Sequence, residues 1–171
     1  SYYFKYVLVN TLSLSVFTML VGFPVPIFLA LLINEIKSTK LKKAVQNITY
    51  MPNFLSIVVI VSMLSLFSNK EYGLFNQITA FFGAKPVDFM SRPSAFQPLY
   101  VFSNVWQNMG FNAIIYIAAL SAIDPQLYEA ASIDGATRMQ KIIHISIPCI
   151  MGTILILFIM RIGNLMSVGF E

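Results

Sequence analysis

The feature that most constrains this chain is its four long apolar runs, at about residues 6–33, 48–67, 99–123 and 146–168. Each run is about 20 residues or longer, which is the length of helix that crosses the hydrocarbon core of a bilayer. Hydrophobic residues make up 57% of the chain and charged residues 11%, against about 45 to 50% and about 25% in soluble domains. The sequence therefore predicts an all-α fold, a polytopic transmembrane helical bundle formed by one domain over residues 1–171.

The first run is longer than a membrane span requires. As one helix it would extend for about 40 Å, whereas the hydrocarbon core is about 30 Å thick. Gly22, Pro24 and Pro26 predict a break, because each proline removes a backbone donor and crowds the preceding turn. The break is either an ordinary kink or a discontinuity that lines a transport pathway.

Charges between the runs predict the orientation. The linker 34–46 carries four lysines against Glu35 and is expected on the cytoplasmic side; the lysines are Lys37, Lys40, Lys42 and Lys43. The charges of the 68–98 segment nearly balance, so this segment is expected outside, with a short interfacial helix over 74–82. The net charge of +4 therefore marks topology, and no groove for nucleic acid is expected.

The third run carries four amide side chains on one stripe of its helix. Asn104, Gln107, Asn108 and Asn112 fall within about 140° of helix surface. Amides in contact with lipid tails would lack hydrogen-bond partners, so the stripe must face other helices or a water-filled path. These residues are either candidates for a substrate path or partners in helix-to-helix hydrogen bonds.

The fourth run is interrupted by Arg161, which is expected towards its outer end. Snorkelling to the headgroups is the default expectation for this arginine, and substrate contact is the alternative. Cys149 is expected to pack in the apolar run as a small hydrophobe, and His144 to be a structural residue at the interface. One cysteine and one histidine predict neither an internal disulfide nor a multi-histidine metal site.

A short helix is predicted between the last two runs, in a cytoplasmic loop over 124–145. Asp124 suits the N-cap, Pro125 the first helical position, and Gly135 the left-handed residue that ends a helix. About ten residues do not form a stable helix alone, so the segment needs a docking surface. It either inserts into a groove on a partner protein or lies on the membrane as an amphipathic connector.

A spaced motif begins in this helix. Glu129-Ala130-Ala131, three residues, Gly135, nine residues, and Ile145-Ser146-Ile147-Pro148 follow one another. The pattern resembles the EAA motif of ABC-importer permeases at every spacing, with Ile147 in place of the usual leucine. The resemblance implies that this helix is the coupling helix, seated in a cleft of an ATP-binding subunit. The coupling residues that it implies are Glu129, Ala130, Ala131, Asp134, Gly135 and Pro148.

The rest of the chain is similar to permeases of the carbohydrate-uptake group, in the oligosaccharide and polysaccharide branch, through Asn10-Thr11-Leu12, Tyr50-Met51-Pro52 and Gly169-Phe170-Glu171. Such permeases have six spans, so the chain is expected to be a fragment with about four. The resemblance implies a bacterial cell membrane, an ATP-binding subunit dimer, a second and different permease, and an extracellular solute-binding protein as partners. ATP and Mg would be bound by the partner, so this chain would be no enzyme and bind no cofactor.

Two other transport functions stay open. One is an ABC permease for a non-sugar solute, because the coupling loop is shared across importers. The other is an ion-coupled secondary transporter, which would require acidic residues within the membrane. None of the four runs contains Asp or Glu, and no constellation of catalytic residues is present for a membrane-embedded enzyme.

Overall fold

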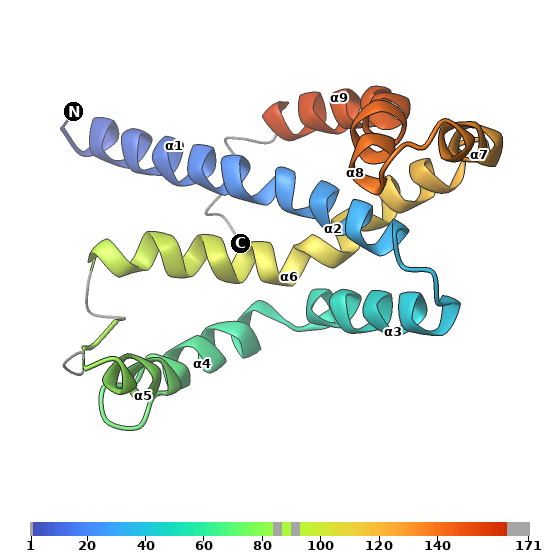
Figure 1. Ribbon diagram of the computed structural model, residues 1–171. Helices are drawn as coiled ribbons and strands as arrows, with labels where there is room; N and C mark the ends of the chain where they lie inside the picture. The colour runs from blue at the N-terminus through green and yellow to red at the C-terminus, as the bar shows by residue number, and fades with distance from the viewer. Residues whose placement is uncertain (1, 84–86, 90–92, 164–171) are drawn as a thin grey trace.

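The computed structural model describes residues 2–83, 87–89 and 93–163, and every regular element within these ranges is helical (Figure 1). In chain order these elements are α1 (Tyr2–Gly22), α2 (Pro24–Asn34), α3 (Thr39–Tyr50), a 3-10 turn (Met51–Phe54), α4 (Ile57–Phe67), α5 (Leu74–Phe81), α6 (Pro93–Ser121), α7 (Pro125–Ile133), α8 (Arg138–Lys141), a π-turn (Ile142–Ser146) and α9 (Ile147–Gly163). The all-α fold class is confirmed.

Helices α1 and α2 form one apolar unit with a break where it was predicted. Residues Val7–Asn34 are long and apolar enough to cross a membrane. Phe23 separates the two helices, and its N–H still donates to the carbonyl of Met19 at 2.9 Å. Pro24 and Pro26 then occupy the first turn of α2, where a missing N–H costs no hydrogen bond within the helix.

The second apolar run, predicted as a span over 48–67, is not one continuous helix, and whether its two parts form one broken span stays a prediction. The chain bends by 97° between Thr39–Phe54 and Ile57–Phe67. Pro52 lies in the 3-10 turn, Leu55 is extended with ψ 136°, and the Ser56 side chain caps α4 by accepting from the N–H of Val59. The linker prediction is also too long, because α3 already begins at Thr39.

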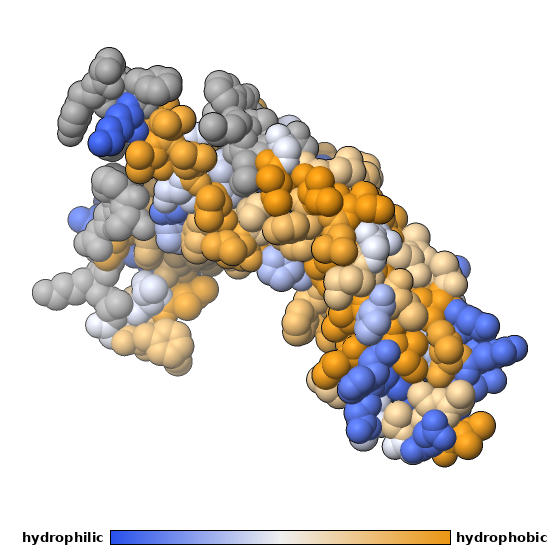
Figure 2. Space-filling view, turned by 90° about the horizontal axis from the view of Figure 1, so that it is seen from above, coloured by the Kyte–Doolittle hydropathy of each residue, from blue (hydrophilic) through white to orange (hydrophobic). Residues whose placement is uncertain are grey.

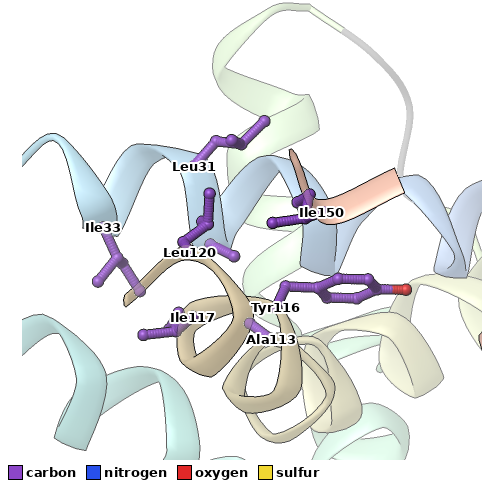
Figure 3. Close-up of a cluster of buried hydrophobic side chains, with 8 residues drawn as sticks. Leu31, Ile33, Ala113, Tyr116, Ile117, Leu120 and Ile150 are labelled. Carbon is purple, nitrogen blue, oxygen red and sulfur yellow. The ribbon is translucent and has the colours of Figure 1, made fainter. Parts of the chain in front are cut away.

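Helix α6 lies at the centre of the fold and forms the core with α2 and α9 (Figure 3). The buried cluster takes three residues from α2, four from α6 and one from α9, namely Ala30, Leu31, Ile33, Ala113, Tyr116, Ile117, Leu120 and Ile150. α6 is long enough to span a membrane, as expected for the run 99–123. It is less apolar than the α1–α2 unit and does not count as a spanning helix by composition, because five amide side chains lie within it. The count of four spans therefore stays a prediction.

The last apolar helical unit begins before the span that was predicted over 146–168. The continuous unit Arg138–Gly163 is long and apolar enough to cross a membrane and starts eight residues earlier in the chain; residues 164–168 of the prediction lie outside the described residues. Only 11% of its most apolar window is buried within this chain. The prediction that Cys149 is buried is wrong, since it is exposed. The apolar run predicts apolar surroundings for Cys149, but the other helices of this chain do not cover it.

The two ends of the molecule differ in character. In Figure 1, α7 lies near the connection between α2 and α3, whereas α5 lies at the opposite end. Figure 2 shows hydrophilic residues gathered at the right-hand end, which carries α7, and a broad hydrophobic surface beside them. Helix α5 confirms the short helix predicted over 74–82. These features agree with the predicted placing of the basic linker and of the α7 segment on one side of the membrane.

Candidate functional site

The start of α7 is specified by two neighbouring residues. The Asp124 carboxylate accepts from the N–H of Gln126 at 2.9 Å, and Pro125 holds the first helical position. A capping carboxylate satisfies one of the donors that every helix start leaves free and interacts favourably with the helix dipole. The predicted N-terminus is therefore confirmed.

The end of α7 depends on a glycine in the left-handed region. Gly135 has φ +75°, a backbone conformation that residues other than glycine rarely adopt. The N–H of Gly135 donates to the carbonyl of Ser132 at 3.2 Å, and the N–H of Ala136 donates to that of Ala131 at 2.9 Å. These two bonds form a Schellman motif, which satisfies carbonyls at the helix end. The predicted role of Gly135 as the helix stop is confirmed.

A second capped turn follows at once. The Thr137 and Gln140 side chains form a capping box at the start of α8. The helix then widens into the π-turn, where the N–H of Ile147 donates to the carbonyl of Ile142, five residues earlier. Pro148 comes directly after this turn and has no N–H to donate to the carbonyl of His144. The π-turn therefore lies where the proline interrupts regular helix bonding.

Two side-chain contacts join α7 to this following segment. The Tyr128 and Ser146 hydroxyl oxygens are 2.9 Å apart, and the Lys141 ammonium donates to the Ser132 hydroxyl at 2.6 Å. Ser146 is 1% exposed, so its hydroxyl depends on Tyr128 for a partner outside its own turn. Sequence reasoning missed this pair; Tyr128 directly precedes the EAA residues, but nothing local pointed to Ser146.

The residues of the predicted coupling helix leave their outer surface open. Glu129, Ala130, Asp134 and Gly135 are exposed, and Ala131 is half-buried. Ile133 at the end of the helix is 87% exposed. A cap at each end and two tethers hold this short helix in place, while Leu127, Glu129 and Ile133 remain exposed. Pro148, also exposed, lies apart from this surface, beyond the π-turn.

The four amides predicted as one stripe of the third run all lie on α6, but they do not line one cavity. Gln107 donates to the Leu55 carbonyl at 3.0 Å, at the bend before α4. Asn108 accepts from Asn53 at 3.1 Å, which ties α6 to the 3-10 turn. Asn104 and Gln107 line a cavity of about 230 Å³ beside α4, whereas Asn112 lines a separate cavity of about 310 Å³. Gln107 and Asn108 therefore make the helix-to-segment hydrogen bonds that were one of the two alternatives.

Arg161 lines the larger of these two cavities. The lining of this cavity comes from the α1–α2 break, α6 and α9, and includes Gly22, Phe23, Pro26, Asn112, Tyr116 and Arg161. The predicted break in the first run thus lines a cavity. Arg161 was expected at the outer headgroups, yet a Cβ built on Gly22 would lie 3.0 Å from its Nη2. No group of His, Cys, Asp or Glu within the described residues is arranged to hold a metal ion.

Comparison with known proteins defines the class. The model of the family described as "Binding-protein-dependent transport system inner membrane component" matches residues 22–168. The chain therefore belongs to this family of membrane transport components, which confirms the resemblance seen in its motifs. The two relatives described next are named as permease proteins of transport systems and not as enzymes, as expected.

Particular relatives are permeases for carbohydrate chains. The polygalacturonan/rhamnogalacturonan transport system permease protein YteP of Bacillus subtilis (strain 168) is 42% identical over 168 residues, which are 98% of this chain and 52% of that protein. The arabinooligosaccharides transport system permease protein AraP of the same organism is 33% identical over 91% of this chain and 50% of that protein. The chain thus spans about half the length of these relatives.

Solved structures agree with the fold. A crystal structure of a bacterial ABC transporter involved in the import of the acidic polysaccharide alginate contains a chain with 46% identity to this one and a TM-score of 0.91. The match covers 95% of this chain and 57% of that one. A second structure, of a bacterial alginate ABC transporter in complex with alginate pentasaccharide-bound periplasmic protein, contains a chain with the same identity and TM-score.

Proposed function

We propose that this chain forms the translocation path and the coupling surface of a permease subunit in an ATP-driven, binding-protein-dependent importer of oligosaccharides. The observation that carries the coupling role is the exposed surface of α7, which is capped at both ends and tethered to the next span. Relatives named for polygalacturonan, rhamnogalacturonan, arabinooligosaccharides and alginate support a carbohydrate substrate.

In this function α7 lies on the cytoplasmic side and docks in a cleft of the ATP-binding subunit, which binds ATP and Mg. Glu129 pairs there with a basic residue, and the small side chains of Ala130 and Ala131 allow close approach. Gly135 adopts the left-handed turn that ends α7 and so keeps the exposed face of this helix available to the ATP-binding subunit. A second permease completes the path in the bacterial cell membrane, and an extracellular solute-binding protein delivers the sugar by favouring one conformational state over the other.

Two substitutions in the full-length subunit test the coupling role. Glu129→Lys reverses the charge at the docking surface, and Gly135→Asp strains the left-handed turn and adds a charge. Each is expected to abolish uptake by the complete importer and to weaken copurification with the ATP-binding subunit, while membrane insertion is retained.

The chain contains a matched control for each change. Gly83 also has positive φ, at +81°, and like Gly135 has open space around it, but it lies by α5 at the opposite end. Gly83→Asp imposes the same backbone strain, and Glu71→Lys the same charge reversal, far from α7. Both controls are expected to import normally. Normal uptake by both Glu129→Lys and Gly135→Asp would instead contradict the coupling role proposed for α7.

A further inference from the structure

An arginine lies in a cavity midway along the first spanning unit. The Arg161 guanidinium lies next to the backbone of Gly22: a Cβ added to this glycine would lie 3.0 Å from the Arg161 Nη2 atom. Gly22 is about 22 Å along the helix from Val7 and about 18 Å from Asn34, the two ends of the apolar unit. The positive charge is therefore located near the middle of this span rather than at its headgroup end.

The helices around this cavity supply no negative charge. The sequences of α1, α2, α6 and α9 contain no Asp or Glu, so Arg161 has no carboxylate partner within the described part of these helices. A guanidinium carries five donors and stays charged. Charged side chains at membrane depth are costly unless they are paired or reach water, and they mark solute pathways.

The other walls suit a sugar rather than a bare ion. Asn112 supplies an amide, and Tyr116 has its ring in the core cluster while its phenolic oxygen points away from the cluster (Figure 3). Phe23, which pairs edge-on with Phe158 at a ring-centroid distance of 5.1 Å, adds an aromatic side chain. The volume of about 310 Å³ falls at the lower end of small-ligand sites, about 300–1,000 Å³.

We infer that this cavity is a binding site for the carboxylate of an acidic sugar unit in the transported chain, with Arg161 as the residue that determines specificity. The inference rests on the proposed function and assigns one residue of its path. Arg161 donates from its planar fork to both carboxylate oxygens, while Asn112 and Tyr116 bond to sugar hydroxyls. A lipid phosphate is not the ligand, because Gly22 places the guanidinium far from either headgroup layer.

The test uses the complete importer, with full-length permeases and its binding protein, in proteoliposomes. Uptake of oligogalacturonate and of alginate oligosaccharide is compared with uptake of their methyl esters, which keep the backbone and lose the charge. The measured quantity is the ratio of acid to ester uptake in Arg161→Gln divided by the ratio in the wild type. The binding protein's own preference cancels in this quotient. It is expected to fall about 10- to 100-fold, as for loss of a charged hydrogen-bonded pair.

Two further variants separate charge from shape. Arg161→Lys retains the charge without the fork and is expected to restore part of the acid preference. Leu157→Ala enlarges the same cavity without changing charge, and is expected to leave the ratio unchanged. If Arg161→Gln lowers acid and ester uptake equally, the arginine is structural and the inference is overturned. If the wild-type importer transports neither series, the proposed function itself fails.

Discussion

The Tyr128 phenol and the Ser146 hydroxyl lie 2.9 Å apart, across 18 residues of sequence. This contact joins the middle of α7 to the end of the π-turn that precedes α9. A displacement of α7 by a docked partner would reach α9 through this contact and through the Lys141–Ser132 bond. We therefore expect α7 and the start of α9 to move together only while these bonds persist.

Removal of either hydroxyl should therefore uncouple ATP hydrolysis from transport. In the full-length importer, Tyr128→Phe and Ser146→Ala are each expected to lower uptake per ATP hydrolysed about 5-fold, which corresponds to about one net hydrogen bond. The double variant should be no worse than either single one. Ser121→Ala is the control, because its hydroxyl donates to the Ile117 carbonyl within its own helix. Additive losses would show that the two residues act separately.

Pro148 is expected to maintain the π-turn. Pro148→Ala supplies an N–H that can bond to the His144 carbonyl, so the segment 142–148 can relax towards regular helix. Amide hydrogen exchange in this segment should slow, and uptake should fall because Ser146 turns away from Tyr128. Pro98→Ala, within α6, should leave exchange at 142–148 unchanged. Unaltered exchange in Pro148→Ala would mean that tertiary packing, not the proline, sets the π-turn.

Gly110 permits α3 and α6 to approach each other closely. A Cβ at this position would collide with the Thr49 carbonyl oxygen of α3. Gly110→Ala must separate α3 from α6, and is expected to lower the free energy of unfolding by about 1–3 kcal/mol. Thermal unfolding of the detergent-solubilised subunit measures this. Gly152→Ala, which has open space around it, should be neutral or stabilise α9; an equal loss in both variants would contradict the steric argument.

The amides of α6 should separate into structural and pathway residues. Gln107→Met removes the donor to the Leu55 carbonyl, and is expected to cost about 1–3 kcal/mol of stability by leaving that group unpaired. Asn104→Ala should leave the unfolding midpoint unchanged and lower uptake, since its side chain faces the smaller cavity. Unfolding and uptake measured on both variants decide this. A stability loss confined to Asn104→Ala would reverse the assignment.

Short-range signals predicted α7 well. The Asp124 cap, Pro125 at the first position and the left-handed Gly135 all lie within about three turns, so their preferences act locally and need no distant partner. The sharp bend at residues 51–56 was not predicted from such local signals. Pro52 indicated an irregularity, but the segment with the 97° bend is hydrogen-bonded to Gln107 and Asn108, which lie more than 50 residues away in the sequence.

Sequence alone determined the membrane class, the orientation signals and the coupling motif, because apolar run length, lysine distribution and residue spacing are properties of the chain itself. Tertiary structure decided which side chains meet. Arg161 and Gly22 are far apart in sequence yet line the same cavity, and Tyr128 bonds to Ser146 at the end of a π-turn. Hydrophobicity places helices in a bilayer without specifying their contacts, so packing alone brought the arginine to the middle of a span.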